Sequence, residues 1–137
     1  MKILNAFSIN MVPDGGHLAI REVSVERVIE RCTRTNPVES CVGHAETAAV
    51  FSAALGISIP YRRVGVVLED GETAFVGQYA GPRLPEGATS VAPGGVIRWY
   101  RVTFVSVPSA IWVMRHAVDG LLSYREAERF VPGAMPG

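Results

Sequence analysis

The first candidate for chemistry is a histidine that follows a glycine at the expected start of a helix. Residues 45–55 are rich in alanine and stop before Gly56, a residue type common just past a helix C-terminus. Gly43 and His44 therefore precede this helix, and Thr47 lies in its first turn. Free N–H groups at a helix start bind anions, glycine admits a ligand to the backbone, and an imidazole exchanges protons near neutral pH. The local residues alone also fit, and by themselves favour, a helix cap in which His44 only closes a turn.

Three short polar side chains interrupt an otherwise apolar run near the N-terminus. Asn5, Ser8 and Asn10 lie within residues 2–11, which begin like a strand. Polar groups in an apolar setting need hydrogen-bond partners. These three either satisfy the local backbone or face a ligand, and their spacing alone favours the structural alternative.

Basic residues in two later segments are candidates for binding an anion. Arg83 and Glu86 are the only charges in the loop at 80–87, which is rich in glycine and proline. The planar guanidinium of arginine suits phosphate oxygens, and a glutamate can relay a proton. The alternative is a surface ion pair of little energetic value. Arg62 and Arg63 can steer an anion or remain a solvated pair.

Composition limits the classes of partner. The chain has 137 residues, 48% of them hydrophobic, which suits one well-packed domain. Lys+Arg and Asp+Glu both number 13, which argues against duplex nucleic acid as an obligatory partner but not against a small anion. Cys32 and Cys41 lack metal-ligand spacing and are expected to be buried free thiols. The apolar run at the N-terminus is too short for a signal peptide or a membrane span, so we expect a cytoplasmic protein without membrane contact.

Alternating apolar residues, turn signals and helical spacing predict an α/β fold in a single domain. Ser24 is a typical N-cap, and apolar residues follow it at helical spacing. An Asp-Gly turn at 69–72 is typical of a hairpin. We therefore expect strands at 2–11, 18–23, 38–42, 61–68, 73–79 and 96–107, and helices from Ser24 to about 35, at 45–55 and at 108–130.

Three short strings occur in the order of a known family. Residues 5–11 read Asn-Ala-Phe-Ser-Ile-Asn-Met, Gly43 and His44 follow, and residues 83–87 read Arg-Leu-Pro-Glu-Gly. The ordered set, at these separations, closely resembles the type III anti-CRISPR ring nucleases first seen in viruses of archaea. The resemblance covers roughly residues 1–106, and the first string is the most specific part of it.

The resemblance implies a fold, a ligand and a reaction. It implies a homodimeric α/β protein with a mixed β-sheet flanked by helices. It also implies a pocket across the dimer axis for cyclic tetra-adenylate, the second messenger of type III CRISPR systems. The family linearises this ring without a metal or another cofactor, through attack of a ribose 2′-hydroxyl. The expected products are linear di-adenylates with 2′,3′-cyclic phosphate ends, formed in the host-cell cytoplasm if the protein is viral.

The resemblance also assigns roles to individual residues. His44 matches the catalytic histidine, and Arg83 and Glu86 match the loop pair of the active site. The ligand-binding set combines residues matched to the family's pocket with the two at the helix start. Its members are Asn5, Ser8, Asn10, Gly43, Thr47, Arg63 and Gln78.

Three departures from the family pattern leave other functions open. Ala45 and Glu46 stand where the family commonly has Asp-Ser, and the Glu46 carboxylate can repel a phosphate. The helix that the family has after the arginine loop is reduced to residues 88–95. We expect residues 107–137 to form a C-terminal extension, a helix plus a loose tail, which has no clear counterpart in the family. Two alternatives therefore stay open. The protein can bind the cyclic messenger as a sponge without cleaving it, or it can be an interaction protein that binds a partner through the extension.

Overall fold

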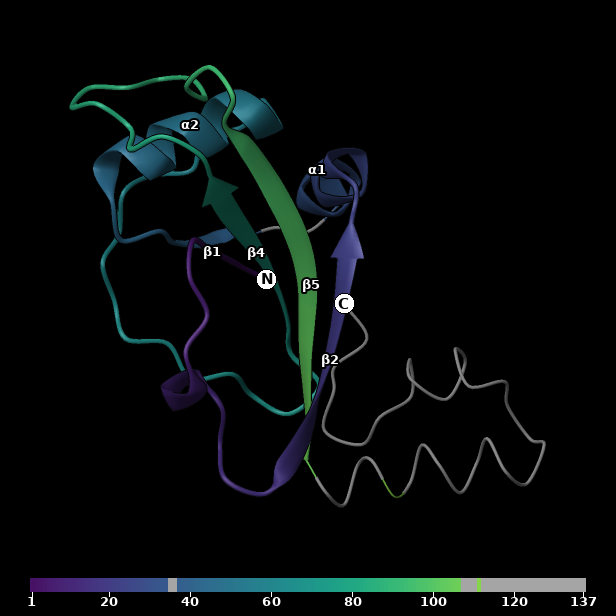
Figure 1. Ribbon diagram of the computed structural model, residues 1–137. Helices are drawn as coiled ribbons and strands as arrows, with labels where there is room; N and C mark the ends of the chain where they lie inside the picture. The colour runs from purple at the N-terminus through teal and green to yellow at the C-terminus, as the bar shows by residue number, and fades with distance from the viewer. Residues whose placement is uncertain (35–36, 107–110, 112–137) are drawn as a thin grey trace.

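The chain folds as a single α/β domain around a five-stranded mixed sheet, as the sequence predicts (Figure 1). The structure is a computed structural model and describes residues 1–34, 37–106 and 111. The strand order is β2-β5-β4-β1-β3, in which β1 runs parallel to β3 and β4, and β5 runs antiparallel to β2 and β4. The elements are β1 (Lys2–Leu4), the 3-10 helix η1 (Ile9–Met11), β2 (Gly16–Val23), α1 (Val25–Arg34), β3 (Glu39–Cys41), α2 (Ala45–Leu55), β4 (Thr73–Ala80) and β5 (Val96–Ser106).

Both predicted helices within the described residues form, with the expected ends. Ser24 precedes α1, and its Oγ accepts a hydrogen bond from the N–H of Arg27 at 3.2 Å. Gly56 follows α2 in the left-handed conformation, with φ of 68°, and its N–H donates to the carbonyl of Ser52. These two caps fix where each helix starts or stops.

The sheet buries apolar residues on both faces. One face packs against α1 and α2, and its core consists of Ile3, Val28, Cys32, Val42, Ala48, Phe51, Leu55, Ile59, Phe75 and Trp99. Because successive strand residues point to opposite faces, Leu4 and Val76 face the other side. There they pack with Val66 and Leu68 from the segment that precedes β4.

A glycine in β4 makes room for the aromatic pair of the helix-side core. The rings of Phe51 and Trp99 lie 4.8 Å apart between centroids. A Cβ atom at Gly77 would lie 2.5 Å from Cζ of Phe51 and 2.7 Å from Cζ3 of Trp99. The absence of a side chain at position 77 therefore lets α2 approach the sheet.

We expect Gly77→Ala to lower the free energy of unfolding by about 1–3 kcal/mol, because the added methyl group overfills the core. Urea unfolding followed by tryptophan fluorescence measures the change. Gly65→Ala is the matched control, since nothing lies within 4 Å of a Cβ atom at that position. An unfolding midpoint of Gly77→Ala equal to that of the control would show that the core accommodates the methyl group.

The hairpin predicted from residues 61–68 is wrong. The turn at 69–72 forms, with the N–H of Glu72 donating to the carbonyl of Glu69 at 3.0 Å. Residues 61–68, however, form no strand beyond an isolated bridge between Val42 and Tyr61. β4 pairs with β1 and β5 instead. Within this segment Val66 and Leu68 pack on the sheet without pairing in it, while Val64 and Val67 are exposed.

The first predicted strand is shorter than expected, and the strands predicted at 18–23, 38–42, 73–79 and 96–107 correspond to β2, β3, β4 and β5. β1 ends at Leu4, and the chain then leaves the sheet and forms η1. Ser8 is the N-cap of η1, so its hydroxyl favours a turn over a continuing strand. The predicted helix at 108–130 and the boundary of the C-terminal extension at 107 lie outside the described residues.

Both cysteines are buried and free, as predicted. Burial raises the pKa of the Cys32 and Cys41 thiols. Among the described residues, no helix combines the length and the apolar character that a membrane span needs.

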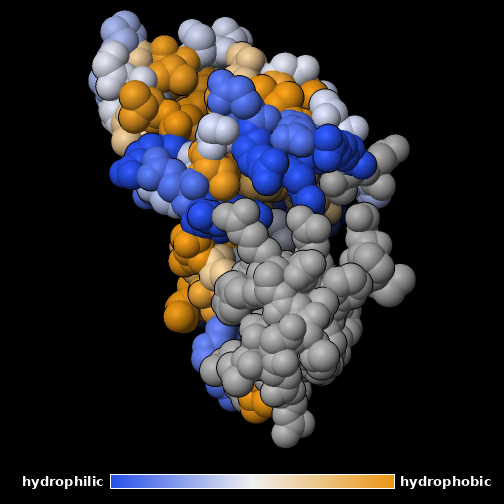
Figure 2. All heavy atoms as spheres, turned by 90° about the vertical axis from the view of Figure 1, so that its right-hand side faces the viewer, coloured by the Kyte–Doolittle hydropathy of each residue, from blue (hydrophilic) through white to orange (hydrophobic). Residues whose placement is uncertain are grey.

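Figure 2 views the molecule from the β2 side, where hydrophilic residues form a band between apolar areas. On β2 and β5, Arg98 donates two hydrogen bonds to the Glu22 carboxylate, at 3.1 and 2.9 Å. The hydrogen bond from Arg98 lowers the pKa of Glu22. These exposed charges are satisfied by each other, and such pairs contribute little to stability.

Candidate functional site

The sheet topology brings the start of the first sequence string and the two later strings to the same end of the sheet. β4, β1 and β3 are neighbours and run parallel, so their carboxyl ends lie together. Asn5 follows β1, Gly43 and His44 follow β3, and the loop at 81–95 follows β4. The carboxyl ends of parallel strands are the usual position of ligand sites in α/β sheets.

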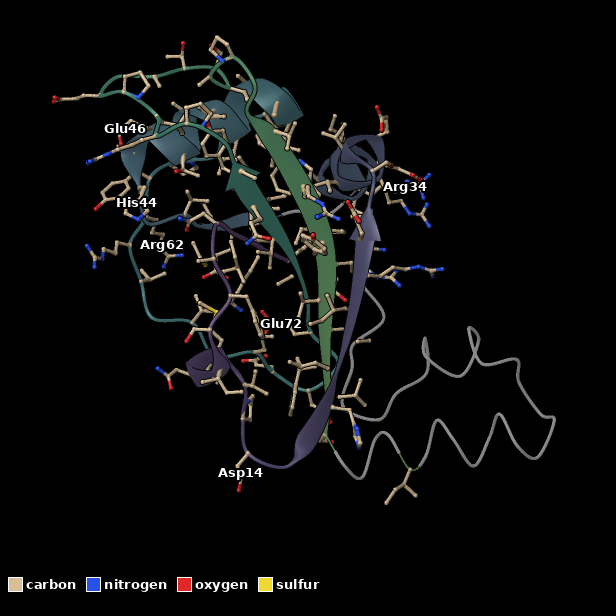
Figure 3. All side chains as sticks on the ribbon, in the orientation of Figure 1. Asp14, Arg34, His44, Glu46, Arg62 and Glu72 are labelled. Carbon is tan, nitrogen blue, oxygen red and sulfur yellow. The ribbon has the colours of Figure 1, made fainter. Side chains whose placement is uncertain are left out.

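An open cavity of about 710 Å³ lies at this end of the sheet, between the start of α2 and the loop after β4. Its wall contains all three residues predicted to be catalytic, His44, Arg83 and Glu86. Figure 3 shows the side chains of His44 and Glu46 near the start of α2. The full lining is His44, Glu46, Thr47, Tyr79, Gly81, Arg83, Leu84, Pro85 and Glu86.

His44 occupies the N-cap position of α2 without using its side chain to cap the helix. Its backbone is extended, with φ of −135° and ψ of 130°, and its carbonyl accepts from the N–H of Ala48. The imidazole makes no capping hydrogen bond and is exposed. His44 therefore caps the helix through its backbone alone, and its ring is free to contact a ligand.

The residue before His44 is held by the N-terminal string. Asn5 Oδ1 accepts a hydrogen bond from the N–H of Gly43 at 3.1 Å. The side chain of Arg63 passes over the same glycine, since a Cβ atom at position 43 would lie 3.6 Å from Arg63 Cγ. Asn5 thus fixes the backbone before His44, and Arg63 lies beside Gly43 but does not line the cavity.

The two charged residues of the loop are not paired with each other. Within the described ranges, no salt bridge joins Arg83 or Glu86 to any residue, and both are exposed. Arg62 differs, because its guanidinium pairs with Glu39 at 2.9 Å. The cavity therefore presents an unpaired guanidinium that is available to an anion.

Two carboxylates balance the positive groups of the cavity. Glu46 is half-buried in the first turn of α2, where a negative charge suits the helix dipole. Glu86 lies on the opposite wall, in the loop. Between residues 1 and 106, outside the undescribed 35–36, no three His, Cys, Asp or Glu side chains cluster so that they could hold a metal ion.

The remaining predicted ligand-binding residues do not line the cavity. Ser8 Oγ accepts the N–H of Asn10 at 3.4 Å, on η1, which Figure 1 places well away from α2. Gln78 is exposed on β4 opposite Arg98, on the sheet face that Tyr79 does not share. A ligand that contacts these residues must extend beyond the cavity.

The sequence reasoning missed Tyr79, Gly81, Leu84 and Pro85 as parts of the cavity wall. Tyr79 has a recognisable signal, because it is the last aromatic residue before the loop that carries Arg83. Apolar and aromatic surface beside a few polar groups is typical of small-molecule sites.

Comparisons with known proteins agree with this fold. The model of a family described as STIV B116-like matches residues 1–92. Among solved structures, B116 of Sulfolobus turreted icosahedral virus is similar in fold, with a TM-score of 0.63. It is 23% identical, and the match covers 74% of this chain and 97% of that protein. No curated protein sequence matches the chain.

Proposed function

The chain belongs to the STIV B116-like family, and we propose that it is a metal-independent ring nuclease. It binds cyclic tetra-adenylate and cleaves it to linear di-adenylate with 2′,3′-cyclic phosphate ends. In the cytoplasm of the host cell this reaction removes the messenger and switches off type III CRISPR signalling. The observation that carries the proposal is that His44, Arg83 and Glu86 line the same cavity.

The proposed reaction needs no external nucleophile. The ribose 2′-oxygen forms a bond to the neighbouring phosphorus, the bond from phosphorus to the 5′-oxygen breaks, and the 2′-hydroxyl proton passes to solvent or to Glu86. His44 as imidazolium donates a proton to the departing 5′-oxygen, as a general acid. Arg83 and the free N–H groups at the start of α2 stabilise the charge on the phosphate oxygens.

A dimer extends this site to the whole ring. Cyclic tetra-adenylate carries four phosphates in a symmetric ring, and one cavity of this size presents one set of catalytic groups. Two protomers related by a two-fold axis supply two identical sets, and two cuts yield two di-adenylates. Residues outside the cavity wall, such as Ser8, Asn10 and Gln78, are then available to the parts of the ring that project beyond it.

The function is tested by measuring binding and cleavage on the same sample. We expect cyclic tetra-adenylate to raise the melting temperature of the protein, because a ligand of the native state stabilises it. We also expect the labelled ring to disappear during incubation in EDTA. An unchanged melting temperature together with intact ring would contradict the proposal and favour an interaction protein.

A second candidate function is a sponge that binds the messenger without cleaving it. It is favoured by Glu46, whose carboxylate lines the cavity two residues after His44, where it can displace a phosphate from the helix start. A raised melting temperature with intact ring after long incubation would select this function. If Glu46→Ser then acquired cleavage, the carboxylate would be the cause.

A further inference from the structure

The loop that carries Arg83 and Glu86 is unusually long for its position. Residues 81–95 join β4 to its antiparallel neighbour β5, and they contain no helix or strand. Common hairpin connections have roughly two to five residues, and longer irregular ones are usually functional. A long loop can place catalytic groups only if something fixes its path.

One side chain touches both ends of this loop. Tyr79 is half-buried in β4, and its hydroxyl donates a hydrogen bond to the carbonyl of Pro82 at 2.5 Å. A Cβ atom at Gly81 would lie 3.1 Å from Tyr79 Oη and 2.6 Å from Cα of Gly95. A Cβ atom at Gly95 would lie 2.7 Å from the same Oη and 2.8 Å from Cε2 of the ring. The two ends of the loop therefore meet at the phenol ring.

The two glycines are required by this close approach. Gly81 adopts a φ of +148°, which side-chain-bearing residues rarely adopt, and its Cα side faces the backbone of Gly95. The close approach of Gly81 and Gly95 therefore leaves space for the Tyr79 ring but not for a side chain at either glycine.

We propose that Tyr79 is a positioning residue for ring cleavage, which sets where Arg83 and Glu86 lie relative to His44. This inference rests on the proposed function. The carbonyl that Tyr79 holds belongs to Pro82 and shares a planar peptide bond with the N–H of Arg83, so the contact orients the backbone where Arg83 begins. Arg83 and Glu86 have no salt bridge of their own among the described residues, so no ion pair fixes their position and they depend on the path of the loop.

Removal of the whole ring is expected to act on kcat more than on KM. Misplacement of a catalytic group by about 1 Å can cost roughly 100-fold in rate. We expect Tyr79→Ala to lower kcat by about that factor, and Tyr79→Phe, which keeps the ring, to lower it only several-fold. Tyr100→Phe is the matched control for loss of a hydroxyl, since Tyr100 is half-buried on β5 outside the cavity wall.

A double-mutant cycle separates positioning from a general loss of structure. If Tyr79 acts through the loop, Tyr79→Ala should cost much less in the background of Arg83→Ala than in the wild type. An equal loss of kcat in both backgrounds would overturn the proposal. Gly95→Ala provides an independent variant, because its methyl group would displace both the ring and the hydroxyl of Tyr79 without removing either of them.

Limited proteolysis tests the same contact without any need for activity. Trypsin cleaves after Arg83, and we expect the rate at this bond to rise in Tyr79→Ala and Gly95→Ala but not in Tyr100→Phe. An unchanged rate at Arg83, or an equal increase at every cleavage site, would overturn the proposal. Failure of the wild type to cleave cyclic tetra-adenylate would refute the proposed function instead, because the tryptic pattern does not depend on it.

Discussion

His44→Ala is expected to lower kcat for ring cleavage by roughly 100- to 10,000-fold, the range that general acid catalysis supplies. The imidazole is exposed at the cavity wall and makes no capping hydrogen bond, so its removal leaves α2 and the fold intact. Binding should change little, since the free N–H groups of α2 and the Arg83 guanidinium remain. Single-turnover cleavage with excess protein measures the rate without interference from product release.

His17→Ala is the matched control for this variant. His17 is also exposed, but it lies on β2, at the opposite edge of the sheet from β3. We expect the His17→Ala protein to cleave the ring at the wild-type rate. A His44→Ala protein that is folded, binds the ring and cleaves it as fast as His17→Ala would exclude His44 as the general acid.

Arg83→Ala should have the second largest effect, a loss of roughly 100- to 1,000-fold in kcat, comparable to removal of one oxyanion donor. Arg83 lines the cavity and has no salt bridge with any described residue, so its charge is available to the phosphate. Unlike the loss of His44, the loss of Arg83 should also weaken binding, because a guanidinium contacts the phosphate before and during the reaction. Titration of labelled ring against protein measures the change in Kd.

Arg83→Lys distinguishes charge from geometry. Lysine keeps the positive charge but loses the planar pair of donors, so we expect a rate between those of Arg83→Ala and the wild type. Arg21→Ala, an exposed arginine on β2, is the control for loss of one charge anywhere on the surface. Equal cleavage by Arg83→Ala and Arg21→Ala would remove Arg83 from the mechanism.

The helix that positions His44 could be predicted from sequence because its signals are local. The alanine-rich run, the Gly56 cap and the preceding glycine all lie within a few residues of one another. The long strand β5 was predicted for the same reason, since its β-prone residues are continuous. Secondary-structure propensity and capping residues indicate the same structure at these positions, and a short segment is predictable from sequence when these signals agree.

The pairing of residues 61–68 could not be predicted in the same way. Val66 and Leu68 alternate as in a strand, yet they satisfy that pattern by packing on the second face of the sheet. Apolar alternation reports burial on one side, and it does not report which backbone lies alongside. The choice of β1 and β5 as partners of β4 depends on contacts far apart in the sequence.

The sequence predicted part of the cavity wall but not how the wall is built. His44, Arg83, Glu86 and Thr47 were all named from sequence and share the cavity wall. The sequence predicted that Asn5 needs a hydrogen-bond partner, and its side-chain Oδ1 accepts a hydrogen bond from the N–H of Gly43. The identity of that partner could not be predicted, because Gly43 is distant from Asn5 in the chain.

The most direct test of the account is the chemistry of the product ends formed by the wild-type protein in EDTA. Radiolabelled cyclic tetra-adenylate is incubated with excess folded protein, and the products are separated before and after acid treatment and phosphatase. The account predicts linear di-adenylate whose phosphate resists phosphatase until acid opens the 2′,3′-cyclic end. Intact ring, or products whose phosphate is removed without acid treatment, would contradict it.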